Sequence, residues 1–178
     1  KRTAADIVAN ADEAELARLF RIYGEIRQAS RLARALVAAR TSNPVTTTAR
    51  LAEVASKFVN PAREKKELAQ VFQALRIVVN GEMDALEAFL EQTVRVLRPG
   101  GHLAVITYHS LEDRMVKNFM RTGRTDGELE KDIFGRSSSP LRPLSSKAIV
   151  PDVAEIESNP RSRSAKLRAA VKISPSNE

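Results

Sequence analysis

Residues 97–120, LRPGGHLAVITYHSLEDRMVKNFM, contain the pattern on which the fold prediction depends. Apolar residues 103–106 form a short continuous run between two glycines and a polar segment, which is typical of a strand buried on both faces. Apolar residues recur at helical spacing both before Pro99 and after Ser110. Helix, strand and helix in this order indicate a parallel sheet with helical crossovers, so the stretch predicts the α/β fold class.

The N-terminal part of the chain, up to residue 76, is predicted to be helical, which makes the chain helix-rich overall. Leu16, Leu19, Phe20 and Tyr23 are spaced so that they share one face of a helix. Further helical patterns cover residues 30–40, 47–58, 67–80 and 81–97, with Gly81 marking a break between the last two.

The C-terminal part has two strand patterns and a polar connection. Residues 122–146 are polar and rich in turn-forming residues, which predicts a long surface loop. Residues 147–150, KAIV, are predicted to form a strand. Residues 161–173 alternate between apolar and basic side chains, and this period of two predicts a further strand.

The composition limits the classes of protein to which the chain can belong. Of its 178 residues, 43% are hydrophobic and 29% charged, as is ordinary for a globular protein. Aromatic residues make up 4% and Trp is absent, so a stacking surface for single-stranded nucleic acid is not expected. No apolar run approaches the roughly 20 residues of a membrane helix. Without Cys no disulfide forms, which is compatible with a cytoplasmic protein.

The charge favours an anionic partner. The formal net charge is +7, and basic residues are in excess in residues 1–80 and again in residues 159–178. An excess of this kind is common in proteins that bind nucleic acid. A charged surface that keeps the protein in solution explains the same numbers, and the two interpretations are equally favoured by charge alone.

The residues that follow the predicted strand 103–106 have more than one interpretation. Ser110, followed three residues later by Asp113, resembles a capping box at a helix N-terminus, so capping is favoured over catalysis for both. His109 lies at the carboxyl end of a predicted parallel strand, where open α/β sheets bind their ligands. A structural histidine and the rim of an active site both remain open for His109.

Several classes of chemistry are excluded by the spacing of residues. No G-x-S-x-G motif is present, and the adjacent side chains of His109 and Ser110 would diverge, which argues against a Ser/His hydrolase. His102 lies about 20 Å from His109 at the usual rise of a strand, so no metal site is predicted. Gly100 and Gly101 follow a helix and precede a strand, the reverse of the order that binds a nucleotide.

Several long segments of the chain, in order, resemble one known family. They are VFQALRIVVNGEMDALEAFL, LRPGGHLAVITYHSLEDRMVKNFM and NPRSRSAKLRAA, and the helical stretch LARLFRIYGEIRQASRLARALVAAR is also similar. The family is that of the bacterial small-subunit ribosomal RNA cytosine-N4 methyltransferases, the MraW or RsmH type. The resemblance extends from about Ala5 to Val171.

The resemblance implies an S-adenosylmethionine-dependent enzyme whose Rossmann-like methyltransferase domain is interrupted by a helical insert. Residues 1–70 would be this insert, a candidate for RNA recognition, and residues 71–178 the C-terminal half of the methyltransferase domain. The family's N-terminal half, which holds the cofactor, has no counterpart in these residues. The chain alone is therefore expected to be inactive and not to bind S-adenosylmethionine, whereas the whole protein would act in the cytoplasm on small-subunit ribosomal RNA or the ribosomal particle.

The resemblance also implies roles for single residues. His109 and Ser110 would be catalytic, contacting the target cytosine, and Arg76 and Asn80 would line the same cleft. Phosphates of the RNA would be held by Arg114, Lys117, Arg161, Arg163, Lys166 and Arg168. For the C-terminal residues of this set, a basic edge strand protected against aggregation is an equally favoured alternative.

Two functions therefore compete. The preferred hypothesis is the incomplete cytosine-N4 methyltransferase, and the alternative is a stand-alone basic RNA-binding or assembly module without catalysis. A half-sheet with apolar strands is also expected to self-associate through its exposed edge.

Overall fold

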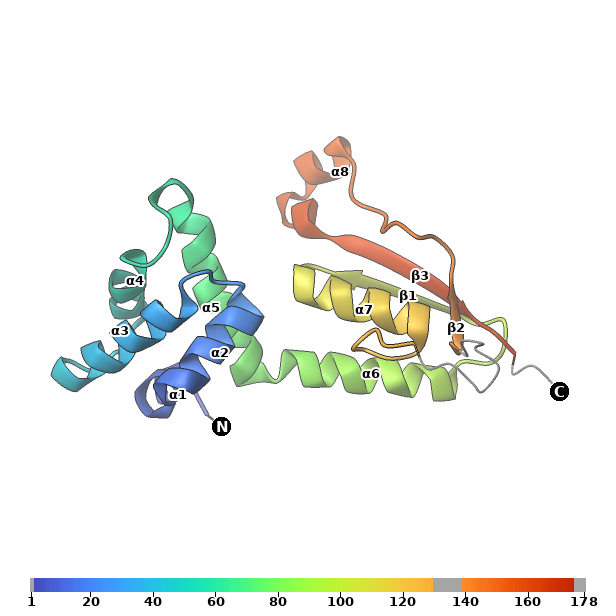
Figure 1. Ribbon diagram of the computed structural model, residues 1–178. Helices are drawn as coiled ribbons and strands as arrows, with labels where there is room; N and C mark the ends of the chain where they lie inside the picture. Colours follow the sequence, from blue (N-terminus) through green and yellow to red (C-terminus); the bar gives the residue numbers. More distant parts are fainter. Residues whose placement is uncertain (1, 130–138, 175–178) are drawn as a thin grey trace. The chain divides into compact units, whose positions relative to one another are not determined.

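The structure is a computed structural model that describes residues 2–129 and 139–174. The chain divides into two compact units, Lys1–Glu82 and Met83–Glu178 (Figure 1). The first unit contains the helices α1 (Ala4–Asn10), α2 (Glu13–Gly24), α3 (Ala29–Ser42), α4 (Thr48–Ser56) and α5 (Glu64–Asn80), with the 3-10 turn η1 (Pro61–Arg63) before α5. The predicted division at residue 70 lies inside α5, whose apolar face packs with the first unit.

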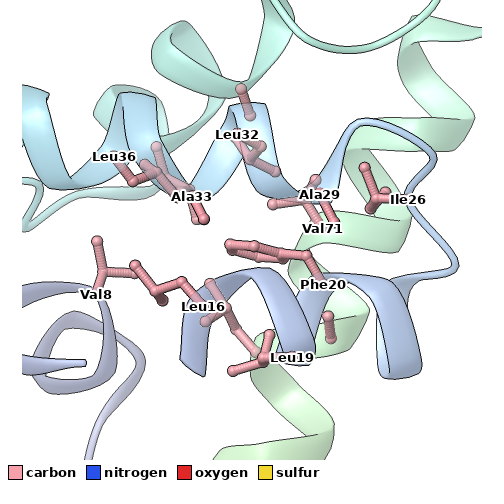
Figure 2. Packing of buried hydrophobic residues seen from close by; sticks show 14 of the residues in the cluster. Val8, Leu16, Leu19, Phe20, Ile26, Ala29, Leu32, Ala33, Leu36 and Val71 are labelled. Carbon is pink, nitrogen blue, oxygen red and sulfur yellow. The ribbon is translucent and has the colours of Figure 1, made fainter. Parts of the chain in front are cut away.

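The core of the first unit is formed where α2 packs between α3 and α5 (Figure 2). Leu16, Leu19 and Phe20 of the predicted stripe are buried, and Tyr23 is partly buried against the same cluster. Asp12 is the N-cap of α2: its carboxylate accepts the backbone N–H of Glu15, and the Glu15 carboxylate in turn accepts the backbone N–H of Asp12. The apolar spacing and the cap together confirm this helix.

A turn at Gly81 separates α5 from α6 (Glu82–Val96), as the sequence predicted. Gly81 has a φ of +64°, a left-handed conformation that glycine adopts without steric cost. The Gly81 N–H bonds the carbonyls of Ile77 and Val78, which ends α5 in the manner of a glycine C-cap.

The second unit contains α6 from Met83 onward, β1 (His102–Thr107), α7 (Ser110–Thr122), β2 (Leu141–Pro143), α8 (Val153–Ser158), the 3-10 turn η2 (Pro160–Ser164) and β3 (Lys166–Lys172). Side chains of α6, α7 and the strands form its core, which includes Leu90, Leu103, Phe119 and Ala170. The helix, strand and helix predicted from residues 97–120 are therefore present, and the helix-rich α/β class is confirmed.

The pairing within the sheet differs from the prediction. Among the described residues the strand order is β1-β3-β2, and both pairs are antiparallel. In this part of the sheet β1 is an edge strand, and its burial alternates: Leu103 and Thr107 are buried, whereas Ile106 is 57% exposed. The prediction of a strand buried on both faces is wrong here, because α7 and α6 cover one face of these strands.

Of the C-terminal strand predicted over residues 161–173, Lys166–Lys172 are confirmed as β3, whereas Pro160–Ser164 form the 3-10 turn η2; β3 is the central strand of the described sheet rather than an edge. Its basic residues share a face with the buried Ala170, which lies opposite Leu103. Lys172 extends from this face and donates to the carbonyls of Val94 and Leu97 at the end of α6, at 2.5 and 2.6 Å. The long side chains of this face thus cover the core and place their charged groups at its margin.

The segment between α7 and β3 was only partly predicted. Residues 130–138 of the expected loop lie outside the described residues. Within the rest, Leu141–Pro143 form β2, with Leu141 buried in the core, so the loop prediction is wrong for these residues. Of the strand predicted at 147–150, Ile149 alone pairs, in a single bridge to Leu167. No helix in residues 2–129 or 139–174 is long and apolar enough to cross a membrane.

Candidate functional site

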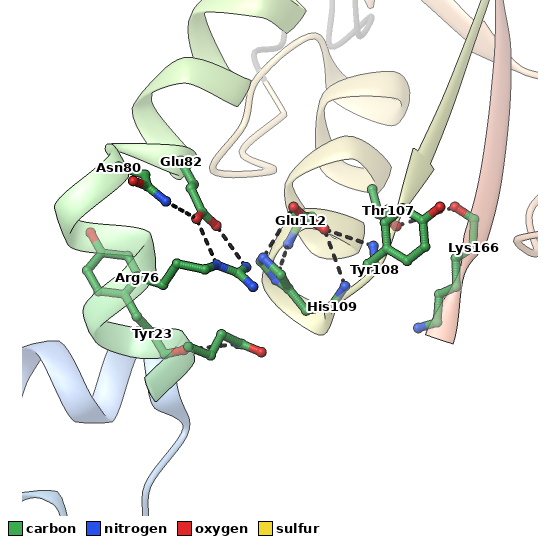
Figure 3. A network of polar contacts seen from close by, with 10 residues as sticks. Tyr23, Arg76, Asn80, Glu82, Thr107, Tyr108, His109, Glu112 and Lys166 are labelled. Atoms are coloured by element: carbon green, nitrogen blue, oxygen red, sulfur yellow. Dashed lines mark hydrogen bonds and ion pairs between the residues drawn. The ribbon is translucent and has the colours of Figure 1, made fainter. Parts of the chain in front are cut away.

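At the junction between β1 and α7, the side chain of His109 caps the N-terminus of the helix (Figure 3). His109 is the N-cap, and its Nδ1 accepts the backbone N–H of Glu112 at 3.3 Å. The Glu112 carboxylate accepts the backbone N–H groups of Tyr108 at 2.8 Å and of His109 at 3.3 Å. The predicted capping box is therefore displaced by one residue: His109 takes the position expected for Ser110, and Glu112 that expected for Asp113.

The cap fixes the tautomer of the His109 ring. Because Nδ1 accepts a hydrogen bond, the hydrogen of a neutral ring is on Nε2. Nε2 lies 3.2 Å from the Glu112 carboxylate, without the alignment of a hydrogen bond, so the contact is electrostatic. Burial raises the pKa of Glu112, but the contact with the His109 side chain and the N–H groups of Tyr108 and His109 outweigh burial and hold this pKa below that of an ordinary Glu. Glu112 is thus a carboxylate at neutral pH.

Asp113 joins α7 to β3. Its carboxylate accepts two hydrogen bonds from Arg168, at 2.7 and 3.2 Å, and lies 3.2 Å from Nζ of Lys166. The side chains of Asp113 and Arg168 are 11% and 13% exposed. Burial raises the pKa of Asp113, but the two cations outweigh it and the net pKa lies below 3.8. Two of the predicted phosphate-binding residues are therefore engaged within the protein.

Arg76 and Asn80, predicted to line one cleft, are brought together by Glu82 (Figure 3). Nε and Nη2 of Arg76 donate to the two carboxylate oxygens of Glu82, at 2.8 and 2.9 Å, and Asn80 donates to one of them at 2.9 Å. Arg76 and Asn80 also line a largely apolar pocket of about 230 Å³ within the first unit, beside Phe72. A polar rim over an apolar pocket suits a flat, partly polar group such as a nucleobase.

The remaining predicted cations lie on the surface of the second unit. Arg114 and Lys117 are exposed on α7, and Arg161 and Arg163 are exposed in η2, directly before β3. Lys117 and Arg168 line a common cleft. The structure therefore places His109, Ser110, Arg114 and Lys117 on one helix and its cap, and joins this helix to Arg168 and Lys166 through Asp113.

Comparison with known proteins identifies the family. The model of the MraW methylase family matches residues 1–173. The chain belongs to the MraW methylase family. The resemblance seen in the sequence is thereby confirmed.

Curated members of the family are similar over nearly the whole chain. The ribosomal RNA small subunit methyltransferase H of Bacteroides thetaiotaomicron is 54% identical over 170 residues, which are 96% of this chain and 56% of that protein. The protein of the same name from Parabacteroides distasonis is 55% identical over 172 residues, 97% of this chain and 56% of its own length. That of Amoebophilus asiaticus is 53% identical over 166 residues. The chain spans about half the length of these curated relatives.

The β1–α7 junction of this MraW family member lacks the features of a nucleotide-binding loop. A nucleotide-type cofactor is held where a strand leads through a glycine-rich loop into a helix. The junction of β1 and α7 has this order of elements, but Tyr108 and His109 stand where the glycines would be. The Glu112 N–H in the first turn of α7 is bound by His109 and is not left to bind a ligand.

Sequence reasoning missed the acids that hold this arrangement together. Glu82 binds the predicted site residues Arg76 and Asn80, and Glu112 binds the predicted site residue His109, yet neither acid was named as a site residue. Glu112 stands three residues after His109, and this spacing was a signal of a capping box with His as cap. The pairing of Asp113 with Arg168 joins residues far apart in the chain, so no local pattern could reveal it.

Proposed function

We propose that this chain is part of an S-adenosylmethionine-dependent methyltransferase that modifies N4 of a cytosine in small-subunit ribosomal RNA. The observation that supports this most is the 54% identity to the ribosomal RNA small subunit methyltransferase H of Bacteroides thetaiotaomicron over 96% of the chain. The choice of cytosine N4 rests on the family resemblance of the segments around Arg76, His109 and Arg161.

In this proposal residues 1–70 are the helical insert that contacts RNA, and residues 71–178 are part of the methyltransferase domain. The cofactor is proposed to be held by a part of the whole protein that this chain does not span, since the β1–α7 junction has Tyr108 and His109 in place of the glycines of a nucleotide loop. This chain contributes the contacts to the RNA and to the target base. Lys117, Arg161 and Arg163 are proposed as phosphate contacts because they are exposed on the second unit.

The target base is proposed to be held by residues around the cap of α7. A base must leave its stack before its exocyclic amine can be modified. Methyl transfer to an amine is an in-line displacement, in which positioning supplies much of the rate. We propose that the hydroxyl of Ser110 contacts the cytosine. His109 is proposed to act as a positioning residue, because its Nδ1 holds the first turn of α7 in place.

The test is methylation by the whole protein that contains this chain. The substrate is small-subunit ribosomal RNA from a strain that lacks the modification, and the product is measured by mass spectrometry of the digested nucleosides. N4-methylcytidine is the expected product. Ser110→Ala is expected to lower kcat about tenfold to a hundredfold, while Ser158→Ala, an exposed serine at the end of α8, leaves it unchanged.

Two results would contradict the proposal. Binding of the RNA without formation of any methylated nucleoside favours the alternative, a basic RNA-binding or assembly module without catalysis. A methylated base other than N4-methylcytidine contradicts the choice of target atom, because the comparison with relatives supports methylation of the RNA without fixing that atom.

A further inference from the structure

The second unit has a cleft between α7 and the segment that follows β2. Its volume is about 480 Å³. The polar side chains of its lining come from both sides: Lys117 and Arg121 from α7, Ser145 and Ser146 from the segment after β2, and Arg168 from β3. Neither Arg121 nor the two serines were predicted as site residues.

The cleft exists because the chain after β2 leaves β3, its neighbour in the sheet, and then pairs with β3 again. The N–H of Leu144 bonds the carbonyl of Ala169, and the N–H of Ile149 bonds that of Leu167, both at 2.9 Å. Between these bonds, residues 145–148 lie opposite Arg168 alone. These four residues cannot all follow the ladder opposite one residue, so they bulge out of the sheet, and Ser145 and Ser146 line the cleft beside α7.

The groups in this cleft suit an oxyanion. Among the described lining residues, Lys117, Arg121 and Arg168 are cations, and no lining residue carries a carboxylate. The nearby carboxylate of Asp113 binds both Arg168 and Lys166, so these three side chains together carry a net positive charge.

The hydroxyl groups of the cleft complete this set of donors. The oxygen of Ser145 accepts the N–H of Lys147, which leaves its own hydrogen to donate. Lys117 and Arg121 are both exposed and stand four residues apart, so they point from the same face of α7. Cations and hydroxyl groups together are the usual donors to the phosphate oxygens of nucleic acids.

We propose that this cleft binds a backbone phosphate of the RNA substrate, an inference that rests on the proposed function. Lys117 and Arg121 hold the phosphate from the helix, and Ser145 and Ser146 from the bulge. Arg168 stays with Asp113 and forms the positively charged floor.

The first experiment tests the cleft with inorganic phosphate as the probe. Amide shifts of the 15N-labelled chain are followed by NMR as sodium phosphate is added, with sodium chloride at equal ionic strength as reference. Saturable shifts are expected at Ser145 and Ser146, and they are lost in the double variant K117Q/R121Q. The control variant R95Q/R98Q removes the same charge from exposed positions of this unit and keeps the shifts.

The second experiment asks whether the ligand is RNA. Binding of a small-subunit ribosomal RNA oligonucleotide is measured by fluorescence anisotropy at several salt concentrations. Each phosphate contact contributes about 0.7 to the slope of log affinity against log salt for a single strand. K117Q/R121Q is expected to lower the slope by about 0.7 and the affinity about tenfold, and R95Q/R98Q to change both much less.

The outcomes separate this inference from the proposed function. Equal slopes for the two double variants contradict phosphate binding by the cleft. Amide shifts at Ser145 and Ser146 that appear with phosphate and chloride alike contradict it too. Phosphate binding without any change in the RNA slope also overturns it, because the ligand is then not the RNA backbone. If the whole protein makes no methylated nucleoside but K117Q/R121Q flattens the slope, the proposed function is contradicted, whereas the binding of an RNA phosphate by the cleft is supported.

Discussion

Replacing Asp113 with Asn should destabilise the second unit by about 2–3 kcal/mol at neutral pH. Removing one partner of a fully buried ion pair costs about 3–5 kcal/mol, because the other charge is left without compensation. Asp113 and Arg168 are nearly buried, at 11% and 13% exposed, but not fully so, which reduces the expected cost. Asn keeps the size of the side chain, so the change reports the loss of charge rather than a cavity.

The effect should depend on pH in a defined direction. The pKa of Asp113 in the folded protein lies below the 3.8 of an ordinary Asp, so the unfolded chain takes up this proton first as the pH falls. The stability that the carboxylate contributes is complete above about pH 3.8 and is lost as the pH falls through the lower folded pKa. The difference between the protein and Asp113→Asn should therefore be constant from pH 7 to pH 5 and shrink below pH 3.8.

Hydrogen exchange read by mass spectrometry is the suitable assay, because a chain of two units need not unfold in one step. Peptides from α7 and β3 report the free energy of opening of the second unit. Glu157→Gln, at an exposed position of α8, is the control and should change it by less than about 0.5 kcal/mol. A loss below about 0.5 kcal/mol for Asp113→Asn, or a larger loss that does not vary with pH, would show that the ion pair of Asp113 with Arg168 does not stabilise this unit.

Further changes have expected outcomes of their own. Lys172→Met should destabilise the second unit by about 1–2 kcal/mol in chemical denaturation, since two carbonyls at the end of α6 lose their donor; an unchanged midpoint argues against this cap. His109→Ala should cost about 1 kcal/mol in the same assay, whereas His109→Asn, a good N-cap, should cost much less. Equal losses for the two His109 variants would show that the cap bond is unimportant. Gly123→Ala should destabilise by more than 1 kcal/mol, because φ is +78° and the new Cβ would lie 2.6 Å from Pro140; a wild-type melting temperature would contradict this. The chain should also self-associate through the edge of β1, where Ile106 is exposed, and a monodisperse monomer in light scattering counts against it.

The spacing of apolar residues predicted the helices of the first unit well, because residues such as Leu16 and Phe20 recur at helical intervals and form the buried faces. It also predicted the order of helix, strand and helix around β1, and the turn at Gly81. These features depend on neighbours within a few residues in the chain. The family resemblance added the membership that comparison confirmed.

Features that depend on distant residues could not be predicted in the same way. The direction of the pairing between β1 and β3 joins residues about sixty positions apart, and nothing in the apolar run 103–106 distinguishes a parallel from an antiparallel partner. The basic side chains of β3 were predicted either to bind RNA phosphates or to protect an edge strand, but Asp113 and the end of α6 provide partners within the protein for Arg168 and Lys172. The sequence alone does not distinguish a strand lysine or arginine that faces water from one that pairs with a buried acid.

We propose that this chain carries contacts for RNA and the target base, whereas the cofactor is held elsewhere in the whole protein. Calorimetric titration of S-adenosylmethionine into the 178-residue chain and into the whole protein tests it most directly. A saturable site in the whole protein and no saturable heat in the chain is the predicted result. Saturable binding to the chain, or none to the whole protein, would contradict the claim.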